Sequence, residues 1–412
     1  MTKQLTRDEM KDLLLTKYNI EMWPEEKIVA FRKALLDWFD AAGRDHLPWR
    51  QNKDPYRIWV SEIMLQQTQV VTVIPYFNRF MTLFPSIKAL VDAEEEALLK
   101  AWEGLGYYSR VRNMQFAAKQ IVNDFDGVFP NDPKDMLTLK GIGPYTAGAI
   151  SSMAFNLPEP AVDGNVMRVF SRLFEIGEDI AKPATLKLFD LLVRIVIDPD
   201  RPGDFNQAIM DLGTDICAPK TYRPEESPIK EFNAAYQNGT MHLYPFKSKK
   251  KKPVPLTMQG VVIQKGNKFL LEKRPTTALL ANFWTFPLIE ADWGKWETKK
   301  TKKSGQLSFM VAEDLPTENQ AGVAKINETV EELTGVAPEK TQPAVGSFNH
   351  VFSHRKWETT VHLIQVPEDA EISGENIRWV DRSEFGEYAF AVPQQKMWDV
   401  ITKHKRNFLN ML

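Results

Sequence analysis

Cysteine is almost absent from this chain, since its 412 residues contain only Cys217. A single cysteine excludes an internal disulfide bond and an all-cysteine metal site. The sequence also lacks a run of 18 apolar residues, so it predicts no membrane-spanning helix. Its start, MTKQLTRDEMKDLLL, mixes charges with leucines and lacks the apolar core of a signal peptide. We therefore expect a cytoplasmic protein.

An excess of basic residues, the usual sign of nucleic-acid binding, is missing as well. The net charge is −2; residues 1–244 contain 28 Lys+Arg and 34 Asp+Glu, and residues 245–412 contain 24 and 20. Any contact with a polyanion must therefore come from local clusters and backbone amides. The apolar content of 43% and the charged content of 26% are typical of a soluble globular protein. The length predicts two or three domains.

The most informative stretch is Leu139–Asn165 (LKGIGPYTAGAISSMAFNLPEPAVDGN). Gly141 and Gly143 predict a tight turn, after which proline opens a helix without the loss of a hydrogen bond. Exposed amides at such a helix start suit a phosphate. A loop then leads to Asp163 and a second amphipathic helix. By itself, the glycine pattern is as compatible with an ordinary helix–turn–helix loop as with a phosphate site. Asp163 could cap the second helix, with or without a further role.

A second candidate is Glu62, in a helix that the residues Asp54-Pro55 are expected to start. Trp59 and Ile63 lie close to it in sequence, and apolar surroundings would raise the pKa of its carboxyl group. A carboxyl that titrates near neutrality can act as a general acid. The alternative is a glutamate that points to solvent, and polarity alone favours this alternative because most helical glutamates are exposed.

Three segments carry a resemblance to a known family. Leu139–Asn165 resembles the helix-hairpin-helix and Gly-Pro-Asp signature of the DNA base-excision glycosylases. Leu47–Arg50 (LPWR) and Val60–Val70 (VSEIMLQQTQV) resemble the adenine-specific branch, which excises adenine mispaired with 8-oxoguanine. The resemblance implies an α-helical N-terminal glycosylase domain of two helical lobes and an α+β Nudix-like C-terminal domain.

The expected boundaries follow from this resemblance and from a change of composition. Residues 1–244 would form the helical domain, with the helix-hairpin-helix at 139–153. Residues 245–256 (PFKSKKKKPVPL) are a basic linker stiffened by prolines, which could run beside a duplex. Residues 257–412 would form the Nudix-like domain.

The resemblance also implies a mechanism, which begins with extrusion of the base from the duplex. Glu62 would protonate the adenine ring at N7, and Asp163 would stabilise the sugar cation either electrostatically or covalently. Asn165 would orient Asp163 or the attacking water. Tyr145 stands where bifunctional relatives have a Schiff-base lysine, so the enzyme is expected to be monofunctional.

Further residues are expected to contact duplex DNA. Gln67 and Tyr107 would open the base stack, and core packing is the alternative for Tyr107. The other candidates for DNA contact are Gly141, Gly143, Arg50 and Leu65. We expect the protein to be a monomer.

The C-terminal domain is predicted from strands and short motifs. Val261–Leu271 predicts a hairpin, residues 345–366 predict paired strands, and 318–333 and 392–408 predict helices. The nearest match to a Nudix metal box, Asn327–Gly335, lacks the arginine and shifts the glycine, which favours a recognition module over a hydrolase. In the family, the loop that matches Phe352, Ser353 and His354 inspects 8-oxoguanine. Without the resemblance, a strand-turn serine and a surface histidine would be the preferred interpretation.

The sequence departs from the family at an expected cofactor. Most relatives bind an iron–sulfur cluster through four cysteines spaced C-x6-C-x2-C-x5-C, and here these positions are Cys217, Pro224, Ser227 and Asn233. Because such clusters require thiolate ligands, we predict that the cluster is absent. No other metal or cofactor is expected, and Cys217 is predicted to be a small buried residue.

Three other functions remain open. An endonuclease III-like glycosylase/lyase for damaged pyrimidines is disfavoured by Tyr145. A non-catalytic DNA-binding scaffold is disfavoured by the presence of both Glu62 and Asp163. A nucleotide-pyrophosphate hydrolase is disfavoured by the degraded Nudix box.

Overall fold

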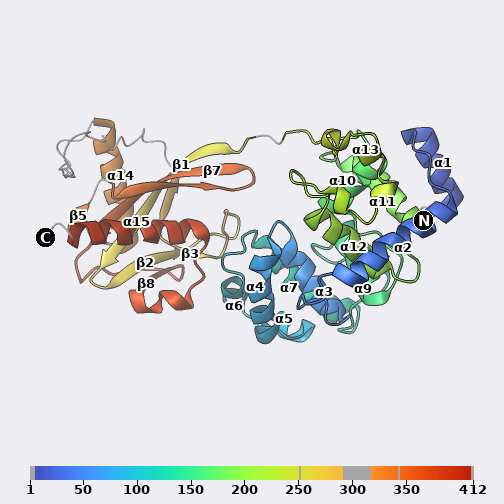
Figure 1. The fold of residues 1–412 in the computed structure, drawn as a ribbon. Helices are drawn as coiled ribbons and strands as arrows, with labels where there is room; N and C mark the ends of the chain where they lie inside the picture. The colour runs from blue at the N-terminus through green and yellow to red at the C-terminus, as the bar shows by residue number, and fades with distance from the viewer. Residues whose placement is uncertain (1–4, 250–251, 291–316, 342–343, 410–412) are drawn as a thin grey trace. The chain divides into compact units, whose positions relative to one another are not determined.

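The computed structural model describes residues 5–249, 252–290, 317–341 and 344–409. The chain divides into two compact units, which Figure 1 colours by residue number. The first unit comprises Met1–Ala93 and Ser109–Lys250, and the second comprises Glu94–Tyr108 and Lys251–Leu412. The segment Glu94–Tyr108 is thus grouped with the second unit, although it lies within the predicted helical domain.

The first unit is helical. Its α-helices are α1 (Arg7–Tyr18), α2 (Glu25–Ala42), α3 (Pro55–Leu65), α4 (Val70–Leu83), α5 (Ile87–Asp92), α7 (Ser109–Asp124), α8 (Pro133–Met136), α9 (Pro144–Phe155), α10 (Gly164–Leu173), α11 (Pro183–Val196), α12 (Pro202–Asp215) and α13 (Ala234–Gln237). Three short 3-10 helices are η1 (Pro224–Glu226), η2 (Lys230–Phe232) and η3 (Met241–Leu243). None of the described helices is long and apolar enough to cross a membrane.

Local sequence signals explain where several helices begin. Asp54 caps α3 by accepting a hydrogen bond of 2.9 Å from the amide of Tyr56, and Pro55 occupies the first helical position. Proline also begins α8, α9, α11 and α12. These starts matter for function because the starts of α3 and α9 determine where the two helices present side chains to each other.

One apolar core joins helices from both ends of this unit. In α2, Ile28, Phe31, Leu35 and Phe39 recur at helical spacing and are buried. They belong to the same cluster as buried side chains of α10, α11 and α12. Helix α2 is therefore amphipathic, and its buried face anchors the start of the chain to the helices that follow the hairpin.

The second unit is built on a mixed sheet. Among the described residues its strands are β1 (Val254–Lys265), β2 (Lys268–Lys273), β3 (Trp284–Thr285), β4 (Leu288–Glu290), β5 (Lys340–Thr341), β6 (Gly346–Val351), β7 (Arg355–Gln365) and β8 (Ile377–Asp381). The order is β3-β2-β1-β7-β5, with β4 beside β1, β6 beside β7 and β8 beside β2. Its helices are α6 (Glu95–Ala101), α14 (Thr317–Thr334), the 3-10 helix η5 (Arg382–Glu387) and α15 (Val392–Leu409).

Helices α14 and α15 cover opposite faces of this sheet (Figure 1). Alternating residues of β1 explain the arrangement, since Val262 packs with Met397 of α15, whereas Val261 packs with Val330 of α14. Because β1 is buried on both faces, its sequence lacks the polar alternation of a surface strand. This agrees with its place in the middle of the sheet, where it pairs in parallel with β7.

Two predicted pairings are confirmed. The turn at Lys265–Lys268 joins β1 to β2, and Gly266 adopts a positive φ of 54° there. Strands β6 and β7 pair antiparallel, and His350 lies opposite Trp357. The segment Phe352–His354 is thus the turn between two paired strands, as predicted. Lys250 and Lys251 of the linker lie outside the described residues.

Candidate active site

A single cleft in the first unit collects most of the predicted catalytic residues. Its volume is about 1010 Å³, at the upper end of the range for ligand pockets. Seven residues predicted from the sequence line it: Arg50, Glu62, Leu65, Gln67, Tyr145, Asp163 and Asn165. They come from α3, α9, the start of α10 and two connecting loops, so segments as far apart in sequence as Arg50 and Asn165 meet at the cleft.

Glu62 lies on α3 and is only 5% exposed. The exposed position that its polarity favoured is therefore wrong, because α3 packs against both α4 and α9. Burial raises the pKa of Glu62 to about 7, and a hydrogen bond from Tyr145 lowers it. Smaller effects come from Asp163, which raises the pKa, and from Arg50, which lowers it. Glu62 can therefore carry a proton near neutral pH.

Tyr145 is the second residue of α9, and its hydroxyl donates a 2.5 Å hydrogen bond to Oε2 of Glu62. Burial and the neighbouring carboxyl groups raise the pKa of Tyr145 well above its usual value, so the phenol stays protonated. It acts as a fixed donor that holds one oxygen of Glu62. The other oxygen is then available to a group in the cleft.

Asp163 is the N-cap of α10 and accepts 2.8 Å hydrogen bonds from the amides of Asn165 and Val166. The side-chain amide of Asn165 donates a third bond, of 2.8 Å, to the other carboxylate oxygen. Burial raises the pKa of Asp163, whereas these three bonds and the charge of Arg168 lower it. The helix-capping alternative is thus confirmed, and it is compatible with a role in the cleft that Asp163 also lines.

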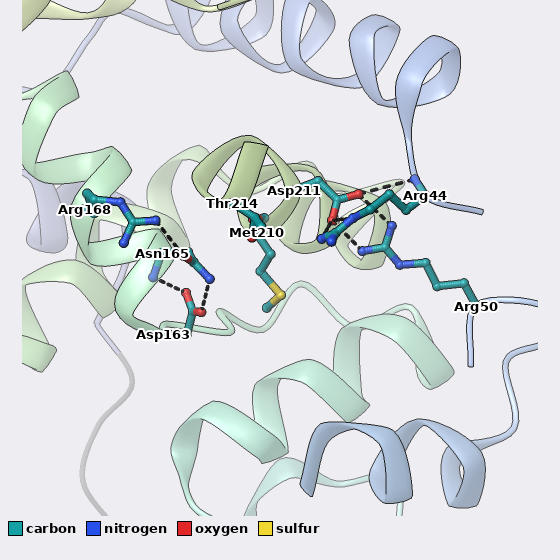
Figure 2. A network of polar contacts seen from close by, with 8 residues as sticks. All are labelled: Arg44, Arg50, Asp163, Asn165, Arg168, Met210, Asp211 and Thr214. Atoms are coloured by element: carbon teal, nitrogen blue, oxygen red, sulfur yellow. Dashed lines mark hydrogen bonds and ion pairs between the residues drawn. The ribbon is translucent and has the colours of Figure 1, made fainter. Parts of the chain in front are cut away.

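Arg168, which the sequence analysis did not single out, holds the orientation of Asn165 (Figure 2). Its Nη2 donates 2.6 Å bonds to Oδ1 of Asn165 and to the carbonyl of Gly213, and its Nε donates a 2.7 Å bond to the carbonyl of Cys217. Because Oδ1 of Asn165 accepts from Arg168, its Nδ2 must point at Asp163. The spacing Asn165-x-x-Arg168 on a helix was the available signal for this contact.

A second polar network on the wall of the cleft was also missed. Asp211 of α12 is 1% exposed and accepts hydrogen bonds from both Arg44 and Arg50 (Figure 2). The only sequence signal was an acidic residue within an otherwise apolar stretch, Ile209–Leu212.

The predicted hairpin turn connects α8 to α9. Gly141 has a φ of 83°, and a Cβ built there would lie 2.9 Å from Cβ of Asn113, so both conformation and space favour glycine. Gly143 is the N-cap of α9, and no side chain caps the amides that follow it. The hairpin thus has the open helix start that was predicted from the sequence.

The remaining recognition residues belong to the second unit. Tyr107 has a φ of 48° and is 45% exposed, so its core-packing alternative is wrong. The hydroxyl of Ser353 lies 3.2 Å from that of Tyr107. The Phe352 ring contacts His350 and Trp357, with centroid distances of 4.5 and 4.9 Å, and the His354 side chain is exposed. One face of this unit therefore presents an aromatic residue next to the turn predicted to read the lesion.

The four positions of the predicted degenerate cluster site do come together. Cys217, Pro224, Ser227 and Asn233 line one cavity of about 10 Å³, which is close to the volume one water needs. The Sγ atom of Cys217 accepts a 3.1 Å bond from the buried Arg172, and Ser227 accepts from the amide of Ile229. Asn233 caps α13. These side chains do not fit an iron–sulfur cluster, since one thiol and neutral oxygens cannot replace four thiolates. Cys217 is 7% exposed, so its predicted burial is confirmed.

Comparison with known proteins gives two family matches. Residues 60–194 match the family model for HhH-GPD superfamily base excision DNA repair proteins, and residues 258–400 match that for the NUDIX domain. The helical unit with its hairpin and the mixed sheet with flanking helices are thus the fold classes predicted from the sequence.

Curated relatives extend the similarity to most of the chain. An adenine DNA glycosylase of Rattus norvegicus is 31% identical over 92% of this chain and 79% of its own length. One of Buchnera aphidicola subsp. Schizaphis graminum is 38% identical over 82% of this chain and 87% of its own length. One of Arabidopsis thaliana is 34% identical over 84% of this chain, which spans 59% of that relative.

Proposed function

The chain belongs to the adenine DNA glycosylase family, and we propose that it flips out and hydrolytically excises adenine that is mispaired with 8-oxoguanine or guanine in duplex DNA. One observation supports this proposal above all others. Two carboxyl groups, the buried Glu62 and the partly buried Asp163, line the same cleft, and the charge of Asp163 raises the pKa of Glu62. Pairs of carboxyl groups with distinct environments are the usual machinery for cleaving a glycosidic bond.

The first step assigned to this pair is proton donation. Adenine is a poor leaving group as an anion, so protonation at N7 weakens the bond from the sugar to N9. Glu62 has a pKa of about 7 and is therefore substantially protonated at neutral pH. Its hydrogen bond from Tyr145 keeps the carboxyl group in one orientation, which is how a general acid is pre-positioned.

The second step is stabilisation of the oxocarbenium-like sugar. Asp163 accepts three hydrogen bonds, which favour its ionised form against the effect of burial. A carboxylate at this point offsets positive charge that develops at the sugar, or forms a bond with it that water then hydrolyses. Asn165, itself held by Arg168, orients Asp163 in either case.

The enzyme is proposed to be monofunctional. A Schiff base requires an amine, and Tyr145 offers a phenol that already donates to Glu62. The abasic sugar should thus remain in the strand after adenine leaves. Lesion recognition is proposed for Phe352, Ser353 and His354, because a hydroxyl group can both donate to and accept from the altered edge of 8-oxoguanine.

Incubation with a duplex that contains adenine opposite 8-oxoguanine tests this function. Strand breaks that form only after alkali treatment are expected. Breaks without alkali would support the glycosylase/lyase alternative, and no breaks under either condition would contradict glycosylase activity and favour a scaffold. A duplex with thymine opposite 8-oxoguanine is the control for base specificity.

We also propose that the enzyme works without an iron–sulfur cluster. The support is the packing of the four corresponding positions around a cavity of about 10 Å³. Cys217 and Ser227 accept hydrogen bonds, Asn233 caps α13, and Pro224 begins η1. Protein purified without oxygen should contain no stoichiometric iron and show no visible absorption band. A cluster that survives purification would contradict the proposal.

A further inference from the structure

We propose that Asp211 is a positioning residue, which holds the loop Gly43–Asp54 and the guanidinium group of Arg50 against the wall of the catalytic cleft. This inference rests on the proposed glycosylase function. It adds a residue of α12 to the site and assigns it a role through Arg50, without direct contact with the substrate.

The contacts of Asp211 are unusually complete for one side chain. Arg50 donates two hydrogen bonds to it, from Nη1 to Oδ2 at 2.7 Å and from Nη2 to Oδ1 at 2.8 Å. Arg44 donates from Nε to Oδ1 at 3.0 Å, also contacts Oδ1 through Nη2, and adds a backbone amide bond to Oδ2 at 3.4 Å. The bidentate geometry fixes the plane of the Arg50 guanidinium group as well as its position.

The three charged side chains of this network are largely shielded from water, so each charge depends on the others. The side chains of Asp211, Arg50 and Arg44 are 1%, 10% and 21% exposed. Hydrogen bonds from the two arginines hold the pKa of Asp211 below its usual range although burial acts in the opposite direction. The carboxylate is therefore ionised at neutral pH. Removing it would leave two largely buried cations that share no anion.

The loop contains neither helix nor strand, so side-chain contacts such as those with Asp211 help to hold it in place. Residues 43–54 connect α2 to α3, and the hydrogen bonds that the structure describes between this loop and α12 run from Arg44 and Arg50 to Asp211. The same loop places Leu47 and Trp49, both nearly buried, in the cleft wall. The guanidinium group of Arg50 also lies over the ring of Phe39, at 5.6 Å from its centroid. Asp211 thus contributes to the position of one wall of the cleft, together with the packing of Trp49 against Phe77.

Arg50 is the cation that connects this network to the chemistry. The groups that act on Glu62 come from three elements: Tyr145 from α9, Asp163 from the start of α10, and Arg50 from the loop. Other charged side chains of the cleft are Arg44, Lys53, Asp200, Arg201 and Asp204. Arg110 of α7 bonds to the carbonyls of Ile63 and Met64 beside Glu62. Arg50 lowers the pKa of Glu62, although less than burial raises it, so a displacement of Arg50 changes the fraction of this acid that is protonated at a given pH.

The direction in which the pKa of Glu62 changes on substitution of Asp211 shows whether Asp211 holds Arg50 in place. If Asp211 positions Arg50, Asp211→Asn releases the guanidinium group, Glu62 loses a neighbouring cation, and its pKa rises. If Arg50 stayed in place, the loss of a negative charge would make the cleft more positive, and the pKa of Glu62 would fall. Activity that needs protonated Glu62 is lost as pH rises through this pKa, so the alkaline limb of the rate profile reports the direction.

The experiment measures single-turnover excision of adenine opposite 8-oxoguanine from pH 5 to pH 9. The full-length wild type is compared with Asp211→Asn, Arg50→Gln and the double variant. We expect the alkaline limb to move to higher pH in all three, by less than about one unit because Arg50 is the smallest of the effects on Glu62, since the loss of a nearby cation raises a carboxyl pKa. The double variant should show no further shift, since Asp211 acts through Arg50. Asp37→Asn, the same change in an exposed ion pair of α2, is the matched control.

A limb that moves to lower pH, or shifts that add in the double variant, would overturn the proposal. If Asp211→Asn does not fold by circular dichroism, Asp211→Glu retains the buried charge, displaces the guanidinium group and should produce the same upward shift. The pKa of Glu62 can also be read without activity, from carbon-13 NMR of the labelled carboxyl group, assigned with Glu62→Gln. A wild type with no excision but the expected NMR shifts would contradict the proposed function and leave the positioning role intact.

Discussion

The candidate functional side chains differ in solvent exposure between the two units. In the helical unit, Glu62 is buried, Asp163 is partly buried, and hydrogen bonds tie them to Tyr145 and Asn165. In the Nudix-like unit, Tyr107 and the turn that contains Ser353 are exposed. A carboxyl group that must have a raised pKa needs to be buried, because an exposed carboxyl group is solvated and keeps a pKa near its usual value. A group that must read a base edge needs to be reachable, and its hydrogen-bonding capacity is sufficient without a pKa shift.

The largest predicted effect is on the excision rate when the buried Glu62 is substituted. Glu62→Gln keeps the shape of the side chain and removes the proton that it donates. We expect single-turnover excision to fall by about 10³-fold, within the range for loss of a general acid, while binding to the mispaired duplex persists. Full activity in this variant would refute the role of Glu62. Glu26→Gln on the exposed start of α2 is the control.

The next effect concerns Asp163. Asp163→Asn should lower excision by about 10²-fold, because it removes the negative charge beside the developing sugar cation. Asparagine is as good an N-cap as aspartate, so α10 should keep its start and the melting temperature should change little. A variant that unfolds, or one that excises adenine at the wild-type rate, would contradict the separation of capping from chemistry.

A smaller effect, on stability, follows from the raised pKa of Glu62. Its folded-state pKa is about 7 and its unfolded value is near 4.5, so the folded state binds more protons between these values. The stability associated with this proton is present below pH 4.5 and is lost as pH rises to 7. Glu62→Gln should thus be more stable than wild type at pH 8, by about 3 kcal/mol, and equally stable at about pH 4, below the unfolded pKa.

Urea unfolding of both proteins at the two pH values measures this difference. Equal stability at pH 8 would show that Glu62 is solvated in solution, which would remove the contrast between the two units.

The smallest effect is expected on the exposed side. Ser353→Ala removes one hydrogen-bonding hydroxyl, a loss of about 0.5 to 1.5 kcal/mol, and the melting temperature should not change. The ratio of excision rates opposite 8-oxoguanine and opposite guanine should therefore fall by about three- to tenfold. An unchanged ratio would argue that the turn does not read the lesion. Ser347→Ala, in strand β6 of the same unit, is the matched control.

Some features of the structure could be predicted from local sequence, and others could not. The start of α3 was predictable because Asp54 and Pro55 act within one helical turn, and the β1–β2 hairpin was predictable because Gly266 marks its turn. The burial of Glu62 was not predictable from polarity, since it depends on α9 packing across α3. The contact from Asp211 to Arg50 joins residues separated by 161 positions, and no local pattern indicates it.

By itself, the sequence determined many of the helical and strand segments, the glycine turn of the hairpin, the two candidate carboxyl groups and the presence of a single cysteine. These follow from local rules of capping, turn conformation and residue chemistry. The tertiary structure alone decided that Glu62 is buried with a pKa of about 7, that Arg168 orients Asn165, and that Asp211 holds the Arg50 loop. Each of these depends on helices distant in sequence that exclude water from the same cleft.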